Sequence, residues 1–318
     1  MALTIDPERF AVGFGVGLPA FIYLYLLWTK KPRLIRSAPP PQVGSEPEVP
    51  QQVRPALAGL FLDGHLTESE IAATIVDLFV RGYMGVLDKG NAIVLIKQRQ
   101  LDDIPLFEKT IAEHILSKGS IVKNELEIER RINQKLYDEH LSEAIRSLYQ
   151  EGLSHGYFIR DPNVQYTWYY LAGLLIFFAG IGSFGLLISH FGETPTLLFY
   201  PLGLMLTGST IITQAKRISA ISGSGRLIQE VWHDYRQELV HFRPNEKHDV
   251  YLKYLPYAFA LGVEEAWTNR WRDIVFERPE WFTTFSVPTR EEFLAKFKQV
   301  VRALARDLYA LRDPALKD

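Results

Sequence analysis

The chain has 318 residues, of which 47% are hydrophobic, but its mean hydropathy is only −0.03, so the apolar residues are concentrated in particular segments. The 35 Lys and Arg residues nearly balance the 37 Asp and Glu residues, which excludes a strongly basic nucleic-acid-binding protein. The sequence has no cysteine, which excludes disulfides, thiolate catalysis and cysteine-ligated zinc or iron–sulfur sites.

Residues 10–28 form the first of three apolar segments, and we predict that they form a transmembrane helix. Their N-terminal flank carries two acidic residues and one arginine, and the segment ends in bulky residues instead of a small-residue cleavage site. We therefore expect a retained anchor and not a removed signal peptide. Four basic residues follow directly, so the positive-inside rule places residues 1–9 outside the cell and the chain from residue 29 onward in the cytoplasm.

Residues 29–55 are predicted to be a cytoplasmic linker. Seven prolines lie between residues 31 and 55, and the segment has no helical periodicity. This composition is typical of an extended, polyproline-like spacer. The alternative is a proline-rich ligand for a binding module.

Residues 56–160 are predicted to form a winged-helix-like cytoplasmic region. The residues from Thr67 to Glu70 read as a capping box, and the apolar residues after it recur at helical spacing. Residues 83–97 then give two β-rich runs around a turn, which is a hairpin signal. Residues 107–160 suggest a second, less regular helical unit, and whether this is another winged helix stays open.

A winged-helix outline raises the possibility of DNA binding, which the charges argue against. Residues 62–160 contain 16 acidic and 12 basic side chains, a net charge of −4. Duplex DNA is held largely by neutralising its phosphates, and an acidic domain repels them. We expect this region to contact proteins and not nucleic acid.

Two further apolar segments, residues 166–190 and 197–213, are joined by the short extracytoplasmic loop 191–196. Neither segment contains Asp, Glu, Lys or Arg, and the loop has no basic residue, whereas Lys216, Arg217 and Arg226 follow. We predict three transmembrane helices in a multi-pass protein of the cell membrane, with the N-terminus outside and the C-terminus in the cytoplasm. The absence of charges favours an anchor over a transporter. Glycines in these segments permit close helix approach and self-association.

Residues 214–318 are predicted to be a mainly α-helical cytoplasmic region rich in aromatic residues. A stripe that includes Trp232 and Tyr235 indicates an amphipathic helix. A second capping box at Thr289 starts the last helix, whose later turns carry Lys and Arg. We interpret these bases as a solvated face, with contact to anionic lipid as the alternative.

Two patterns in this region could carry chemistry. Glu230 with His233 and Glu238 with His241 both have the ExxH spacing of di-iron bundles, but they lie on one predicted helix, about 12 Å apart along its axis. Residues 222–225 (SGSG) could present amide groups to an anion, but lack the rest of a phosphate-binding loop, so a flexible joint is favoured. We assign no catalytic, cofactor-binding or metal-ligating residue.

Two sequence blocks carry a family resemblance. Residues 55–84, PALAGLFLDGHLTESEIAATIVDLFVRGYM, and residues 251–271, YLKYLPYAFALGVEEAWTNRW, resemble the two motif blocks of the domain of unknown function 2207 family. The resemblance covers roughly residues 55–271 and implies a prokaryotic membrane protein with cytoplasmic modules, no established activity and no catalytic residues. Longer members place an extracytoplasmic β-rich domain before the first span, and here we expect that domain to be missing. The glycine- and serine-rich tail of the family is replaced by the helix predicted at 289–312.

Two functions from different classes follow. The first is a membrane-anchored protein-interaction or regulatory scaffold, and the alternative is a membrane-associated enzyme with a site between the two cytoplasmic regions. Polar residues of both regions facing a common pocket, His233, Arg236 or Glu264 toward Arg81 or His65, would favour the enzyme. Docked apolar faces would favour the scaffold. We expect Trp267 and Tyr257 to belong to the core.

Overall fold

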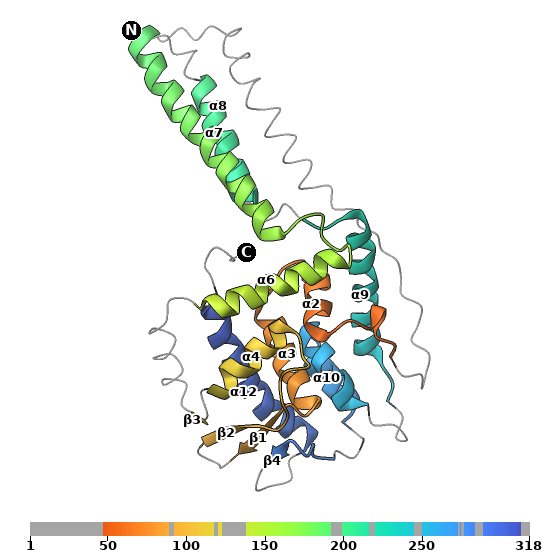
Figure 1. The fold of residues 1–318 in the computed structure, drawn as a ribbon. Helices are drawn as coiled ribbons and strands as arrows, with labels where there is room; N and C mark the ends of the chain where they lie inside the picture. Colours follow the sequence, from red (N-terminus) through yellow and green to blue (C-terminus); the bar gives the residue numbers. More distant parts are fainter. Residues whose placement is uncertain are drawn as a thin grey trace. The chain divides into compact units, whose positions relative to one another are not determined.

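The computed structural model describes residues 47–88, 92–117, 120–122, 138–191, 199–215, 220–244, 250–272, 274, 277–283 and 289–312. The chain divides into two compact units (Figure 1). Unit 1 comprises residues 1–37 and 162–220, and unit 2 comprises residues 38–161 and 221–318. Unit 2 is therefore built from two stretches of chain, with the apolar segment of unit 1 between them.

Most of unit 2 is helical. A short 3₁₀ helix, η1 (Pro50–Gln52), precedes the α-helices, which are α2 (Pro55–Asp63), α3 (Glu68–Val80), α4 (Leu106–Ser117), α6 (Glu139–Ser154), α9 (Gly223–His241), α10 (Tyr251–Ala260), α11 (Glu264–Arg270) and α12 (Arg290–Ala310). The strands are β1 (Met84–Asp88), β2 (Ala92–Lys97), β3 (Ser120–Val122) and β4 (Phe282–Thr283).

Both predicted capping boxes are confirmed. At the start of α3 the Thr67 hydroxyl oxygen accepts a hydrogen bond from the backbone N–H of Ser69 at 3.1 Å, and the Thr67 N–H donates to a Glu70 carboxylate oxygen at 2.5 Å. At the start of α12 the Thr289 hydroxyl oxygen accepts from the N–H of Glu292 at 3.2 Å, and the Thr289 N–H donates to the Glu292 carboxylate at 3.1 Å. Each box satisfies N–H groups that a helix end leaves without intrahelical partners.

The sheet of unit 2 is shared by the two stretches of chain. The predicted hairpin is confirmed: β1 pairs antiparallel with β2, and β2 pairs antiparallel with β3. The fourth strand comes from the C-terminal stretch, because β4 pairs parallel with β1, with Val86 opposite Phe282. The strand order is therefore β3-β2-β1-β4.

The predicted winged-helix-like module, with a separate mainly helical C-terminal region, is wrong. Helices α10 and α12 of the C-terminal stretch both pack against α3 (Figure 1), and β4 extends the sheet of the predicted wing. Hydrophobic periodicity shows that a helix has a buried face, but not which element covers that face. The sequence therefore predicts helix α3 and the β1–β2 hairpin, but not the elements that cover them.

The core of unit 2 is centred on α3 and is rich in aromatic side chains. Phe79 of α3 stacks on Trp281 with ring centroids 5.4 Å apart and meets Phe297 of α12 edge-on at 5.5 Å. Trp267 is fully buried, and its indole N–H donates to the backbone oxygen of Tyr251 at 3.1 Å. The Trp267 expectation is confirmed, because the aromatic block of α10 and α11 lies in the core.

Unit 1 contains α7 (Pro162–Phe191) and α8 (Phe199–Gln214), and the prediction of three transmembrane helices is wrong. Within the described residues one helix is long and apolar enough to cross a membrane, at Val164–Leu186 of α7. Helix α8 has 16 residues, which at about 1.5 Å per residue is shorter than the ~30 Å hydrocarbon core of a bilayer. The predicted helix at residues 10–28 lies outside the described residues.

Helices α7 and α8 pack closely through glycine. A Cβ atom added to Gly208 would lie 2.6 Å from the backbone nitrogen of Phe177, and one added to Gly180 would lie 3.0 Å from the backbone oxygen of Pro201. Gly182 and Gly185 of α7 have no described atom this close, since none lies within 4 Å of an added Cβ. Of these glycines, Gly180 and Gly208 lie where the two helices touch, and Gly182 and Gly185 do not.

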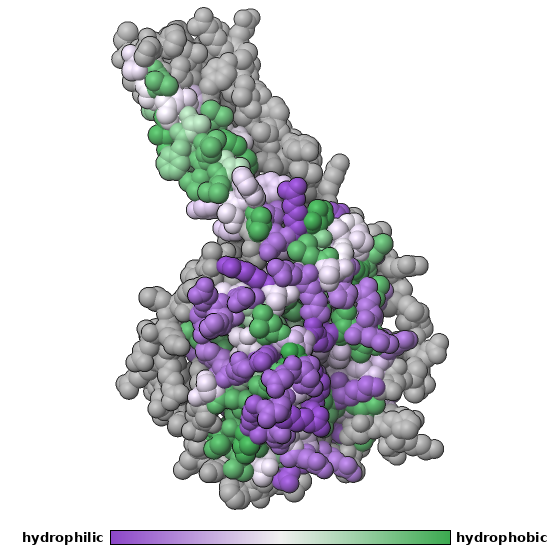
Figure 2. Space-filling view, in the orientation of Figure 1, coloured by the Kyte–Doolittle hydropathy of each residue, from purple (hydrophilic) through white to green (hydrophobic). Residues whose placement is uncertain are grey.

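The outward side of unit 1 is apolar. Large side chains of α7 and α8 are exposed, among them Leu175, Phe178, Leu186 and Leu206. Figure 2 shows this hydrophobic surface along the two helices. A helix pair with apolar side chains on its outside is suited to lipid and not to water.

We predict that Gly208→Ala destabilises unit 1 by about 1–3 kcal/mol, because the new methyl group would overlap the backbone of α7. Gly182→Ala and Gly185→Ala are the matched controls, and each should be neutral or stabilising by about 0.5–1 kcal/mol through helix propensity. Thermal unfolding in mild detergent measures all three. Equal losses for Gly208→Ala and Gly182→Ala would contradict the described packing.

Candidate functional site

The two sequence blocks that carry the resemblance meet inside unit 2. Helix α10, from the second block, packs against α2 and α3, from the first. The Tyr257 hydroxyl donates to the backbone oxygen of Val53, just before α2, at 2.9 Å. Gly59 of α2 faces Glu70 of α3 and the backbone oxygen of Ala260. The motif residues therefore come together over one helical junction.

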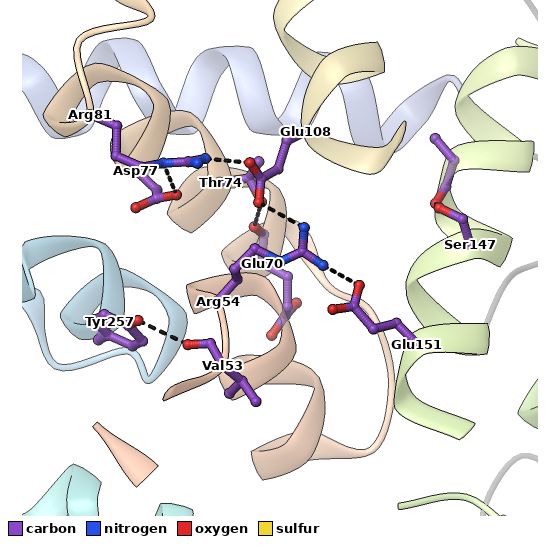
Figure 3. A network of polar contacts seen from close by, with 11 residues as sticks. Val53, Arg54, Glu70, Thr74, Asp77, Arg81, Glu108, Ser147, Glu151 and Tyr257 are labelled. Atoms are coloured by element: carbon purple, nitrogen blue, oxygen red, sulfur yellow. Dashed lines mark hydrogen bonds and ion pairs between the residues drawn. The ribbon is translucent and has the colours of Figure 1, made fainter. Parts of the chain in front are cut away.

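An ion-pair network lies at this junction (Figure 3). Glu108 of α4 pairs with two arginines, Arg54 before α2 and Arg81 after α3. Arg54 also pairs with Glu151 of α6, and Nε of Arg81 lies 2.8 Å from a carboxylate oxygen of Asp77. Four separate parts of the chain are thereby joined: the segment before α2, and helices α3, α4 and α6.

The network places three carboxylates against two guanidinium groups. The Glu108 side chain is 5% exposed, whereas Arg54 and Arg81 are 28% and 35% exposed. Burial raises the pKa of Asp77 to about 6, although Arg81 favours its charged form. Burial also raises the pKa of the Tyr257 hydroxyl. Because each arginine bonds to two carboxylates, the arrangement holds the helices together by charge-assisted contacts.

A second buried carboxyl lies beside the network. Glu70 is fully buried, and one of its oxygens accepts hydrogen bonds from the N–H and the hydroxyl of Thr67 at 2.5 and 2.6 Å. Its other oxygen, Oε1, has no hydrogen-bond partner among the described residues. A Cβ atom added to Gly59 would lie 2.5 Å from Oε1, so the α2 glycine makes room for the carboxyl. Burial raises the pKa of Glu70 to about 7.

The residues whose meeting in one pocket would favour an enzyme have other contacts. Arg81 pairs with Asp77 and Glu108, whereas Glu264 pairs with Lys298 and Arg302 at 2.9 and 2.5 Å. His65 is exposed, with Nδ1 3.0 Å from the backbone oxygen of Asp63, and the histidine at position 233 is exposed on α9. The faces that dock around α3 are apolar.

Both ExxH motifs lie on the single helix α9, as predicted. Within the described part of the chain, no group of three or more His, Asp or Glu side chains is arranged to hold a metal ion.

The SGSG segment is a fixed cap and not the flexible joint we expected. The Ser222 hydroxyl accepts from the N–H of Gly225 at 2.7 Å, and the Ser222 and Ser224 hydroxyls both donate to the backbone oxygen of Gly156. A β-bridge between Phe158 and Ile221 adds to these bonds. We call this set of contacts, between residues 156–158 and 221–225, the clip.

The clip holds together the two places where unit 2 connects to residues 162–220. The Ser222 N–H donates to the backbone oxygen of Tyr157 at 2.8 Å, and a Cβ atom added to Gly225 would lie 2.1 Å from the same oxygen. The Tyr157 hydroxyl donates to the backbone oxygen of Phe61 in α2 at 2.6 Å. The apolar segment therefore leaves unit 2 and returns to it at one point on its surface.

Sequence reasoning missed the ion-pair network and the buried state of Glu70. Glu70 was recognised as a capping residue, but a capping box can be buried or exposed with the same sequence. Arg54 lies in the segment predicted to be a linker, where no buried contact is expected. Glu108 lies on α4, and the sequence does not show which helices pack against α4. The detectable signal was that Asp77 and Arg81 lie one helical turn apart.

An apolar helix long enough to cross a membrane, Val164–Leu186 of α7, is a feature of membrane proteins. The chain belongs to the DUF2207 family: residues 45–270 match the family model described as "Predicted membrane protein (DUF2207) C-terminal domain". The matched range begins before α2 and ends with α11, so β4 and α12 lie beyond it. Neither a curated protein nor a solved structure gives a significant match to the chain.

We predict that Glu108→Gln lowers the free energy of unfolding by about 1–3 kcal/mol, because two arginines lose one of their carboxylate partners. Glu113→Gln is the matched control, since Glu113 is an exposed residue of the same helix. Denaturant unfolding of both variants in detergent measures the difference. A loss no larger than that of the control would show that the network contributes little to stability.

Glu70 should make stability depend on pH. Its pKa is about 7 when folded and near its ordinary value of 4.5 when unfolded, so the folded state binds the proton more tightly. As pH rises from 4.5 to 7 the free energy of unfolding therefore falls, by roughly 3 kcal/mol at most from this group. Glu70→Gln stays neutral and should not show this decrease. The free energy of unfolding is measured for both proteins at pH 5 and pH 8. The variant should gain stability relative to the wild type between pH 5 and pH 8.

The matched control for this prediction is Glu68→Gln, in the exposed first turn of α3. The stability of this variant relative to the wild type at each pH is the reference against which the Glu70→Gln result is judged. If Glu70→Gln behaved like this control, Glu70 would be ionised in the folded protein, and its assigned environment would be wrong.

Proposed function

We propose that the protein is a membrane-anchored protein-interaction scaffold, in which unit 1 inserts into the membrane and unit 2 binds other proteins at the cytoplasmic face. One observation carries the proposal: residues 162–220 interrupt the sequence of unit 2, and the residues of unit 2 that flank them are joined at the clip. A segment attached in this way can hold unit 2 at a membrane while the two stretches of unit 2 stay folded together.

The charges around the apolar segment support the cytoplasmic side for unit 2. Arg160 lies just before α7, and Lys216, Arg217 and Arg226 follow α8 in the sequence. Residues 192–198, between the two helices, contain no Lys or Arg. Basic residues near membrane segments are enriched on the cytoplasmic side.

The use of the motif side chains supports a scaffold over an enzyme. Arg81 forms ion pairs with Asp77 and with Glu108 of α4, and Glu70 caps a helix. The aromatic residues of the second block fill the core. The motif residues thus stabilise unit 2 from within, and the outer surface of unit 2 is free to bind other proteins. A net acidic region favours protein partners over nucleic acid.

Photo-crosslinking in native membranes tests this proposal. Ile96 and Leu106 are large apolar residues of unit 2 that are 45% and 47% exposed, on β2 and α4. A photoreactive phenylalanine analogue at either position should give a discrete crosslinked species with a cytoplasmic protein, which mass spectrometry identifies. The same analogue at Phe178, an exposed residue of α7, is the control and should not capture that protein.

The outcome separates the parts of the proposal. Binding of the identified partner to the purified full chain, measured by calorimetry, would support the scaffold. Crosslinks to extracytoplasmic proteins would contradict the orientation. A scan of exposed unit 2 positions without any discrete crosslink would contradict the interaction role.

A further inference from the structure

Unit 2 exposes a small apolar patch beside the clip. Ile159 is 66% exposed, and Leu227 and Val231 of α9 are 62% and 47% exposed. We call these three residues the junction patch. Single exposed hydrophobic residues are common on proteins, so the argument for a function rests on where these three lie.

The clip brings the junction patch together. Ile159 directly follows Phe158, whose bridge partner is Ile221. Leu227 lies in the second turn of α9, which begins at Gly223, and Val231 is one further turn along the same face of the helix. Ile159 and Leu227 therefore lie within two residues of the clip along the chain, and Val231 lies one helical turn beyond Leu227.

The chain itself limits how far this point can be from the membrane. The apolar part of α7 begins at Val164, five residues after Ile159. Five residues span at most about 17 Å when fully extended, and the interfacial layer adds roughly 5–8 Å to each side of the hydrocarbon core. Ile159 is thus close enough to the membrane boundary to reach the headgroup layer.

We propose that the junction patch lies in the interfacial layer of the bilayer that holds unit 1, so that unit 2 touches the lipid directly. This inference rests on the proposed membrane anchoring and adds a lipid-contacting surface to unit 2. Lipid is the occupant favoured by position, because the patch is continuous along the chain with the membrane segment. Apolar side chains next to a membrane segment are stabilised at the acyl–headgroup boundary.

The charges around the junction patch predict which lipids matter. Arg160 and Arg226 are exposed near it, and Asp161 and Glu230 lie at the same junction. Because these four charges balance, they add little net attraction to anionic lipid. The contact should therefore form in a bilayer of zwitterionic lipid alone.

Spin labelling tests this inference on the full chain. The protein has no cysteine, so Leu227→Cys introduces a single thiol for a nitroxide label. In nanodiscs of phosphatidylcholine, the ratio of oxygen accessibility to nickel-chelate accessibility at position 227 should be several-fold higher than at Gln237→Cys. Residue 237 is exposed on the same helix and lies outside the patch. Both variants should keep the wild-type circular dichroism spectrum.

A third label separates this inference from the anchoring on which it rests. Leu175 is 72% exposed on α7, so Leu175→Cys reports insertion of unit 1. A lipid-like ratio at 175 with a water-like ratio at 227 would overturn the lipid contact and leave the anchor standing. Water-like ratios at both positions would overturn both. Protection at 227 in detergent micelles without lipid, from both oxygen and the chelate, would indicate a covering protein surface and would also overturn the inference.

Discussion

The burial of α3 by two distant stretches of chain is the constraint on which the rest of the structure depends. Ile71, Ile75 and Phe79 are fully buried, and the elements that cover α3 come from both sides of residues 162–220. Burying a large apolar side chain contributes about 1.5–3 kcal/mol, so neither stretch can leave this core without a large loss of stability. The apolar segment must therefore begin and end at the surface of one folded unit, and the clip is where it does so.

The ion-pair network and Glu70 serve the same junction. The network of Arg54, Arg81 and Glu108 joins helices that the apolar core already brings together, and truncating one member would leave buried charge without its partner. Glu70 places a carboxyl against Gly59, at the contact between α2 and α3. In the structure these residues hold the helices of unit 2 together.

Local features could be predicted from the sequence, and long-range partners could not. The capping boxes at Thr67 and Thr289 were predictable because such a box is complete within four residues. Strand β4 has two residues and no periodic pattern, so nothing local marks it as the partner of β1. The predicted three-span topology relied on apolar length, whereas the described part of the chain holds a single helix that is long and apolar enough to cross a membrane. Arg81 pairs with Glu108 of α4, and no local sequence pattern predicts that α4 packs beside the end of α3.

The most direct test of this account is to produce unit 2 by itself, by removing residues 1–37 and replacing residues 162–220 with a short glycine–serine linker that joins Asp161 to Ile221. Because the clip already holds these ends together, we expect a soluble, monomeric protein that unfolds in a single cooperative transition. Its melting temperature in detergent-free buffer, together with its mass by light scattering, is the measurement. A protein that aggregates, or one whose two stretches unfold separately, would contradict the claim that they form one domain.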